Sequence, residues 1–230
     1  MASGVMGIGG GAFLVPIMTE IFGIDAHIAV ATSLFTIIFT SGSSLLGHHR
    51  LKGIDWTISR NLLILAIPSA IVGSYLSDVV PSDSLRTLFG IILIFASLGV
   101  YLSVRLSVEP HQDQSPIPLA LTGCLGGFFS GLLGIGGAIV MVPIMILFLR
   151  VDAKRAVSSV VPVVFVSAIF GTLMHAAIGH VDLPLVAIIV LATIPGAQVG
   201  VWIFGRITSQ RVKFIYAILL IIIGVKMIFT

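Results

Sequence analysis

Two clusters of glycine are the residues best suited to chemistry in this sequence, and that chemistry is the binding of an anion by the backbone. They are Gly9, Gly10 and Gly11 in the first half of the chain, and Gly136 and Gly137 in the second. Glycine lets a backbone unwind and approach a ligand closely. The apolar segments that start at Ala12 and Ala138 are predicted helices, whose first N–H groups would face the break. A helix N-terminus acts like about half a positive charge, so two that converge would attract an anion.

Neutral side chains are the predicted partners of these N–H groups. No Asp, Glu, Lys or Arg lies near the middle of any predicted membrane span, so hydroxyl and amide groups must complete the site. The candidates are Thr32 and Ser33, matched in the second half by Ser158 and Ser159, together with Gln198. Two other roles are common for such residues: hydroxyls often bond back to their own helix, and glycines often serve close helix packing.

Two histidines hold equivalent places at the far end of the first full span of each half. They are His48 and His175, which are 127 positions apart. A histidine at the end of a span often lies at the membrane interface. Because its pKa is near neutrality, it is also the group at these positions that could bind and release a coupling proton.

The spacing of 127 residues applies to the whole chain, which is a duplicated unit. Residues 7–18 and 134–145 share Gly-Ile-Gly-Gly and Val-Pro-Ile-Met in the same register, and the aspartate pairs Asp25 and Asp152, and Asp55 and Asp182, follow it. Roughly a quarter of positions 1–103 match their partners. Two copies of an apolar unit, each with a glycine-rich break, are typical of secondary transporters.

The composition identifies the solvent of this protein as a lipid bilayer. Apolar residues make up 57% of the chain and charged residues 9%, and the mean hydropathy is +1.19. So few polar groups cannot cover a water-soluble surface of this size. Continuous apolar stretches of about 20 residues match the length of a helix that crosses the membrane. We therefore predict an all-α integral membrane protein.

Each half is predicted to hold one broken element followed by three transmembrane helices. The predicted spans are 28–46, 57–76, 85–104, 156–178, 183–204 and 212–229. The broken or re-entrant elements are 1–22 and 117–149. The first repeat thus covers 1–104, a polar linker 105–116, and the second repeat 117–230. The first broken element has fewer residues before its glycines than the second.

The positive charges in the loops predict that the two repeats are inverted. In the first copy they follow the first full span, whereas in the second copy they precede the equivalent span and follow the next one. The residues are Arg50, Lys52 and Arg60 in the first copy, and Arg150, Lys154, Arg155, Arg206, Arg211 and Lys213 in the second. Because cytoplasmic loops are enriched in Lys and Arg, this pattern indicates opposite orientations. The alternative is four ordinary spans per repeat in parallel.

Several of these motifs together resemble the TauE/SafE sulfite exporter family, also called the toluene sulfonate uptake permease family. They are Gly-Ile-Gly-Gly-Gly before Val-Pro, Ala-Val-Ala-Thr-Ser after Asp-Ala, a His before Gly53-Ile54-Asp55, and a Gly after Ile-Pro. The family's glycine motif falls on residues 7–11 and 134–137, and its Thr-Ser motif on Thr32 and Ser33. The second copy departs from it, with Ser158 and Ser159 followed by Val160.

The resemblance implies a multi-pass transporter of a prokaryotic inner membrane that moves sulfite, sulfoacetate or related sulfonates. We expect alternating access, in which the anion binds between the repeats at the helix N-termini. An anion channel of the same architecture is the alternative. The partners expected for the protein are the substrate, the bilayer and a coupling proton. A homo-oligomer is compatible with this role, and no nucleic acid is expected.

Enzymatic activity and metal or cofactor binding are not expected. A buried serine nucleophile would need a Gly-x-Ser-x-Gly elbow, which the sequence lacks, and Ser43 has no counterpart in the other repeat. A metal transporter would need ligands within its spans, but the histidines lie mostly near loops. The lone Cys124 offers neither a disulfide framework nor a thiol metal site.

Overall fold

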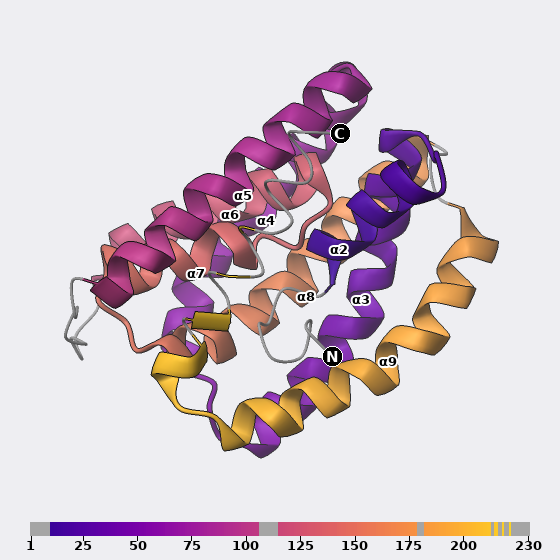
Figure 1. The fold of residues 1–230 in the computed structure, drawn as a ribbon. Helices are drawn as coiled ribbons and strands as arrows, with labels where there is room; N and C mark the ends of the chain where they lie inside the picture. Colours follow the sequence, from indigo (N-terminus) through magenta and orange to yellow (C-terminus); the bar gives the residue numbers. More distant parts are fainter. Residues whose placement is uncertain are drawn as a thin grey trace.

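The computed structural model describes residues 10–105, 115–178 and 182–212, with residues 214, 215, 218 and 221, and the elements in this part are helices (Figure 1). In chain order they are α2 (Gly11–Pro16), the π-helical turn η1 (Ile17–Ile21), α3 (Ala26–Arg50), α4 (Trp56–Val79), α5 (Ser82–Arg105), α6 (Pro116–Leu133), α7 (Ala138–Leu147), α8 (Ala153–Ile178) and α9 (Leu183–Arg206). Within the described residues, six are long and apolar enough to cross a membrane: α3, α4, α5, α6, α8 and α9.

Five predicted spans are confirmed as helices, and each is extended by a few residues at one or both ends. The extensions contain the polar ends that hydropathy alone does not include, such as Arg50 in α3 and Arg206 in α9. The sixth predicted span, 212–229, lies almost entirely outside the described residues, as do Gly9 and most of the linker.

Aspartate caps explain where four of these helices begin. The carboxylate of Asp25 accepts the His27 N–H at 2.9 Å at the start of α3, and Asp152 accepts the Lys154 N–H at 2.9 Å at the start of α8. Asp55 and Asp182 do the same for α4 and α9. Such caps satisfy N–H groups that have no partner within the helix. The two caps of the first repeat, Asp25 and Asp55, therefore recur 127 residues later as Asp152 and Asp182.

The second broken element is a pair of helices joined by glycines. Between α6 and α7, Gly134, Gly136 and Gly137 have φ angles of 67°, 78° and 70°, a left-handed conformation that favours glycine. The prediction treated the whole element as broken, yet α6 alone has 18 residues and could cross the membrane. α6 runs beside α4 in the same direction, and α7 then leads back to the start of α8 (Figure 1).

α3 and α8, the equivalent helices of the two repeats, lie side by side and run antiparallel. Near the start of α3, Thr32 Oγ1 lies 3.4 Å from the Asp182 N–H, which comes after the end of α8. Near the start of α8, Ser159 Oγ accepts the Asp55 N–H at 2.9 Å, after the end of α3. Thr32 and Ser159 are equivalent in the repeat, and so are Asp182 and Asp55. The two repeats therefore exchange the same contact.

α6 packs so closely against α4 that only glycine fits at three positions. A Cβ atom at Gly123 would lie 2.0 Å from the Leu62 carbonyl oxygen, and one at Gly127 would lie 2.2 Å from that of Ala66. At Gly131 the corresponding distance, to the Ala70 oxygen, is 2.1 Å. Small residues at such spacing let two membrane helices approach closely.

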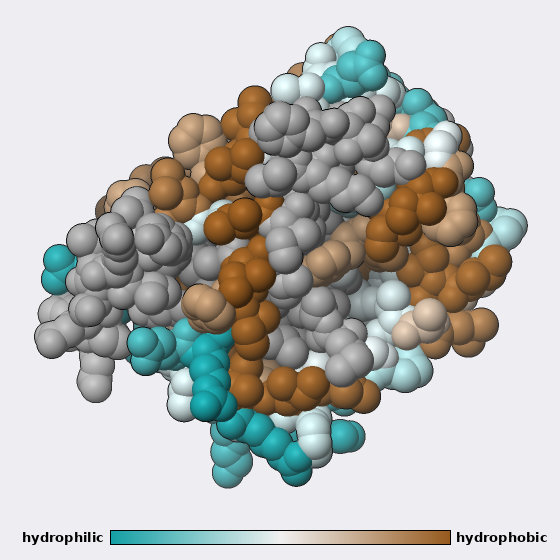
Figure 2. All heavy atoms as spheres, viewed as in Figure 1, coloured by the Kyte–Doolittle hydropathy of each residue, from teal (hydrophilic) through white to brown (hydrophobic). Residues whose placement is uncertain are grey.

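The positive charges converge on one end of the molecule, which we call the cationic end. α3 ends there, α4 and α8 begin there, and α9 ends there, because Arg155 contacts Asp55 and Lys154 lies over Phe204. Its exposed or half-buried basic residues are Arg50, Lys52, Arg60, Arg150, Lys154, Arg155 and Arg206. Figure 2 shows hydrophilic side chains near the ends of the visible face and apolar side chains over much of the surface between them.

The α4–α6 packing can be tested by adding a single methyl group. Replacing Gly127 by Ala should lower the free energy of unfolding by about 1–3 kcal/mol, because the Ala66 carbonyl oxygen is part of the backbone and cannot move aside easily. Thermal unfolding in detergent would measure this. Gly99→Ala is the matched control, since its Cβ would make ordinary contact at 3.4 Å with Pro143; equal stability of the two variants would contradict the packing argument.

Candidate functional site

The described parts of the two glycine breaks meet inside the molecule. A Cβ atom at Gly11, the first residue of α2, would lie 2.3 Å from the Gly134 carbonyl oxygen and 2.9 Å from Ile135 Cα. Gly10 and Gly11 are buried, and so are Gly136 and Gly137. The backbone of one break therefore touches the backbone of the other with no side chain between them. Gly9 lies outside the described residues.

Each break leads directly into a short helix. Gly10, with a φ of 97°, precedes α2, and Gly137, with a φ of 70°, precedes α7. The Leu14 N–H donates to the Gly10 carbonyl at 3.1 Å, and the Met141 N–H donates to that of Gly137 at 3.0 Å. These first turns begin at the junction of the breaks, so both helix N-termini start in the interior of the molecule, as predicted from the sequence.

Ser33 is the predicted hydroxyl that reaches a break. Its Oγ donates to the Gly134 carbonyl oxygen at 2.8 Å, and the side chain is fully buried. A buried carbonyl with no partner would cost about 1–3 kcal/mol. Ser33 thus fixes the start of the glycine loop. Its neighbour Thr32, also fully buried, lies beside the Asp182 N–H.

Ser158 and Ser159 lie toward the other end of the α3–α8 pair. Ser158 Oγ is 3.0 Å from His48 Nδ1, and Ser159 Oγ accepts the Asp55 N–H. His48 follows Ser33 by 15 residues on α3, which separates the two places by about 22 Å along the helix. The four predicted hydroxyls therefore do not form one shell, and a single small anion cannot touch all of them at once.

Gln198 is placed on a different contact. Its amide nitrogen donates to Ser43 O at 2.7 Å and to Ser43 Oγ at 2.8 Å, which joins α9 to α3 at an exposed position. Other hydroxyls of α3 bond back to their own helix, as Thr36 does to the Thr32 carbonyl at 2.9 Å. Thr36 thus bonds to the backbone of its own helix, the common role of membrane hydroxyls, whereas Ser33 bonds to a different element.

Both repeat-related histidines are fully buried rather than at an exposed membrane interface. The His48 ring packs edge-on against Phe204, with ring centroids 4.7 Å apart, and its Nδ1 contacts Ser158. His175 Nε2 lies 3.3 Å from the Gly131 carbonyl oxygen, so its Nε2–H can donate to it. The two rings therefore occupy equivalent sites with different partners.

Sequence reasoning used Asp55 and Arg155 only as topology signals, but they form an ion pair between the repeats. Arg155 Nε donates to Asp55 Oδ2 at 2.9 Å, and Arg155 NH2 makes a second contact with the same oxygen. Burial raises the pKa of Asp55, but the hydrogen bonds and charge of Arg155, with the Thr57 and Ile58 N–H groups, outweigh this and lower that pKa. The reversed charge pattern of the two copies was the signal that could have paired them.

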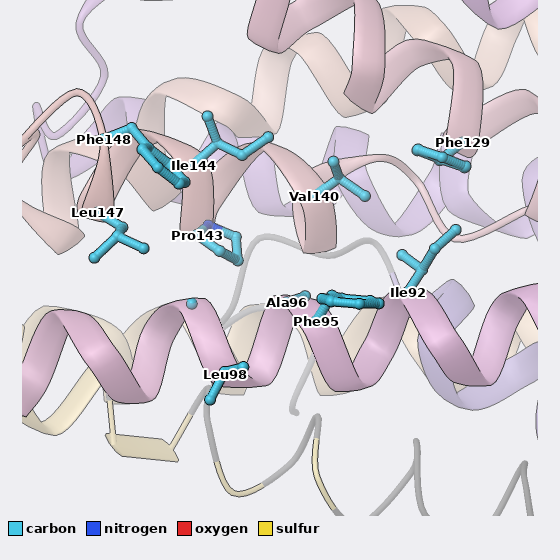
Figure 3. A pocket seen from close by; sticks show the side chains of 11 residues that line it. Ile92, Phe95, Ala96, Leu98, Phe129, Val140, Pro143, Ile144, Leu147 and Phe148 are labelled. Carbon is cyan, nitrogen blue, oxygen red and sulfur yellow. The ribbon is translucent and has the colours of Figure 1, made fainter.

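One prominent hollow has no chemistry suited to an anion. It has a volume of about 370 Å³ and lies between α5 and α7, where Phe95, Pro143 and Phe148 are among its lining residues (Figure 3). Its lining side chains are all apolar, so it offers no hydrogen-bond donor to a charged solute. The hollow is not a candidate for the anion site.

The described part of the chain offers no cluster of metal ligands. Among its residues, no three His, Cys, Asp or Glu side chains come together in a way that could hold a metal ion. Cys124 is a free thiol in α6 and is partly buried.

Comparison with known proteins finds the family that the sequence motifs resemble, over nearly the whole chain. The family model described as sulfite exporter TauE/SafE matches residues 1–227. The probable membrane transporter protein YunE of Bacillus subtilis is 30% identical, over 98% of this chain and 92% of the relative. The probable membrane transporter protein MJ0441 of Methanocaldococcus jannaschii is 30% identical, over 97% and 89%. No solved structure matches this chain.

The Asp55–Arg155 pair should make stability depend on acidity. Because the folded-state pKa of Asp55 is lowered, its contribution is present above the unfolded value of about 3.9 and is lost as the pH falls through the folded pKa. Asp55→Asn should therefore lower the melting temperature at pH 7, and its deficit relative to the wild type should shrink toward pH 3. Melting curves in detergent between pH 3 and 7 would measure this, with Asp83→Asn as the control. A deficit of constant size would contradict the assignment.

Proposed function

Because the chain belongs to the TauE/SafE sulfite exporter family of membrane transporters, we propose that it is a secondary transporter of small sulfur-containing anions. The substrate class is sulfite, sulfoacetate or a related sulfonate. The protein is located in a prokaryotic inner membrane, which it spans several times. The family description supports the sulfur anion, and the six candidate spans support the multi-pass arrangement.

The meeting of the two glycine breaks is the observation that carries this proposal. The anion binds at this junction, where Gly11 approaches Gly134 and where Gly136 and Gly137 lead into α7. Two helix N-termini supply partial positive charge. The Ser33 hydroxyl beside them donates to the Gly134 carbonyl in the described arrangement and would turn its O–H to the anion on binding. This combination favours an anion whose charge is spread over several oxygens, because backbone N–H groups offer many weak donors rather than one strong cation.

The two repeats are inverted across the membrane. The antiparallel α3 and α8, and the exchange of the same hydrogen bond at both ends of this pair, support that arrangement. Three crossings after each broken element place equivalent helices in opposite directions. The end that carries Arg50, Lys154 and Arg155 then faces the cytoplasm, following the distribution of positive charge.

Transport proceeds by alternating access, in which one repeat rocks against the other around the bound anion. Contacts between the repeats at the cationic end hold that side closed in the described arrangement: the Asp55–Arg155 pair, and the Ser59 hydroxyl that donates to the Ser159 carbonyl at 2.7 Å. An opening at that end would have to break these contacts. A channel with the same architecture would conduct without saturating, whereas a carrier saturates.

His48 and His175 are the proposed sites of a coupling proton. Both are buried, and each lies near the contact between α8 and another helix, so a change in their charge would alter packing between elements that move. Proton binding at either ring would therefore be linked to a rearrangement of its surroundings.

The substrate class can be tested with purified protein in detergent. We expect one sulfur anion among sulfite, sulfate, thiosulfate, sulfoacetate and taurine to raise the melting temperature selectively over chloride. Saturable uptake of that anion into proteoliposomes would support a carrier over a channel. A protein that is folded but unaffected by the whole panel would contradict the proposed substrate class.

The binding site can be tested by changing the glycine junction and Ser33. Gly10→Val should abolish uptake, because valine strains a backbone with a φ of 97° directly before α2. Ser33→Ala should weaken anion-induced stabilisation about tenfold in apparent affinity, the effect of about 1.4 kcal/mol. Thr193→Ala is the control, since its hydroxyl bonds to its own helix at the Ile189 carbonyl. Normal uptake by folded Gly10→Val and Ser33→Ala variants would overturn the proposed site.

A further inference from the structure

A second cavity opens at the cationic end, on the seam between the repeats. It has a volume of about 290 Å³, a size that suits a small solute rather than a nucleotide or a drug-sized ligand. Leu51 and Gly53 line it from the first repeat, and the second repeat contributes Lys154, Arg155, Ser158 and Phe204. The cavity is therefore built from both repeats, at a place where their relative motion would change its shape.

Of the two cations that line this cavity, Arg155 has a carboxylate partner, whereas Lys154 makes no ion pair among the described residues. Arg155 is paired with Asp55, and the lowered pKa of that carboxyl keeps the pair neutral in sum at pH 7. The Lys154 ammonium lies 5.6 Å from the centre of the Phe204 ring, a cation–π contact that leaves its donors available to a solute. Asp152 binds the Lys154 and Arg155 N–H groups at the start of α8, so the helix end adds little.

A hydroxyl backed by a buried imidazole lies on the wall of this cavity. Ser158 is about 1% exposed, and its Oγ is 3.0 Å from Nδ1 of the fully buried His48. When the imidazole Nδ1–H donates to the Ser158 oxygen, the hydroxyl proton stays available to a solute in the cavity. Such a hydroxyl beside an ammonium group is a suitable pair of partners for the oxygens of a small anion.

The equivalent place at the other end of the molecule lacks these features. In the repeat register, Lys154, Arg155 and Ser158 correspond to His27, Ile28 and Ala31. Gly205, another lining residue, corresponds to Asp78. The side chains that could attract an anion at the cationic end are thus replaced by a histidine, two apolar residues and a carboxylate. Only the cationic end holds this set of groups within the described residues.

We propose that the cavity at the cationic end is a receiving site that binds a small oxyanion, such as a sulfonate or sulfite, before it reaches the glycine junction. The proposal rests on the proposed function in that the transported solute is an anion. Lys154 attracts the anion, the Ser158 hydroxyl holds one of its oxygens, and opening of the Asp55–Arg155 pair lets it pass inward. The receiving site is about 22 Å from Ser33 along α3, so it is separate from the glycine junction.

Chemical labelling tests the receiving site without requiring transport. Leu51, which is 47% exposed and lines the cavity, is replaced by Cys in a Cys124→Ala background. The rate of its modification is measured with the anionic 2-sulfonatoethyl methanethiosulfonate and with the cationic trimethylammonium reagent. Lys154→Gln should lower the anionic-to-cationic rate ratio about threefold or more, the effect of one elementary charge several ångströms away in water.

Arg60→Gln is the control, because it removes one positive charge from an exposed residue of the cationic end that does not line the cavity and is not adjacent to Leu51 in the sequence. Methanesulfonate should also protect Leu51→Cys from the neutral methyl methanethiosulfonate, and Lys154→Gln should remove this protection. Equal effects of Lys154→Gln and of the control variant would mean that the labelling ratio reports only the general potential of the surface, and this would overturn the proposal. Absence of protection in the Lys154-containing protein would overturn it as well.

A transport experiment separates this proposal from the proposed function. In oriented proteoliposomes, Lys154→Gln should raise the KM for sulfite severalfold when sulfite is supplied at the cationic end, with an unchanged KM at the other end. An equal rise at both ends would place Lys154 in the common transport path and contradict a one-sided receiving site. Absence of sulfite flux in the wild type would contradict the proposed substrate, while the labelling experiment would still decide the receiving site.

Discussion

The antiparallel contact between α3 and α8 is the constraint on which the rest of the structure depends. Both helices are largely buried, and each begins where the other ends. Contacts at Leu34 with Gly171 and at Gly42 with Phe165 mark the crossing between these helices. α4 then packs on α8 as α9 packs on α3. The central pair thus gives α4 and α9 equivalent positions, one on each helix of the pair. The broken elements lie against the same pair, α2 on α3 and α7 on α8.

The glycine breaks are possible only because this central pair surrounds them. In the hydrocarbon core no water can bind a backbone group that has left its helix, so irregular backbone must find partners within the protein. Ser33 of α3 supplies one for the Gly134 carbonyl, and Gly11 lets the other break lie directly against the same oxygen. In the proposed function, the backbone N–H groups of this junction are the groups that would bind the anion.

The sequence predicted five of the spans and the position of the breaks, because length, hydropathy and a repeated glycine motif are local properties of the chain. It could not predict how the hydroxyls are distributed. Matching residues in two copies are equivalent, but equivalent residues of antiparallel helices are close only near the crossing. Thr40 and Ser167 lie on the stretches of α3 and α8 between the Leu34–Gly171 and Gly42–Phe165 contacts, whereas Thr32 and Ser159 lie toward opposite ends. The prediction of a single shell treated equivalence as proximity. The burial of His48 and His175 was missed for a related reason, since hydropathy does not indicate which helix covers the end of a span.

A duplicated backbone gives the two ends of the molecule similar geometry, so their differences must come from side chains that depart from the repeat. The surroundings of the two histidines illustrate this. His48 has Phe204 beside it, but the residue equivalent to Phe204 near His175 is Ser77, and Val201 is likewise replaced by Ser74. Ser74 and Ser77 are buried with no hydrogen-bond partner for their hydroxyls, which is costly unless water or a solute reaches them. The side chains therefore differ, with an aromatic ring beside His48 and buried hydroxyls at the equivalent positions of the other half, although the helices are equivalent. In such a protein the matching residues maintain the fold, and the mismatches make the two membrane faces chemically different.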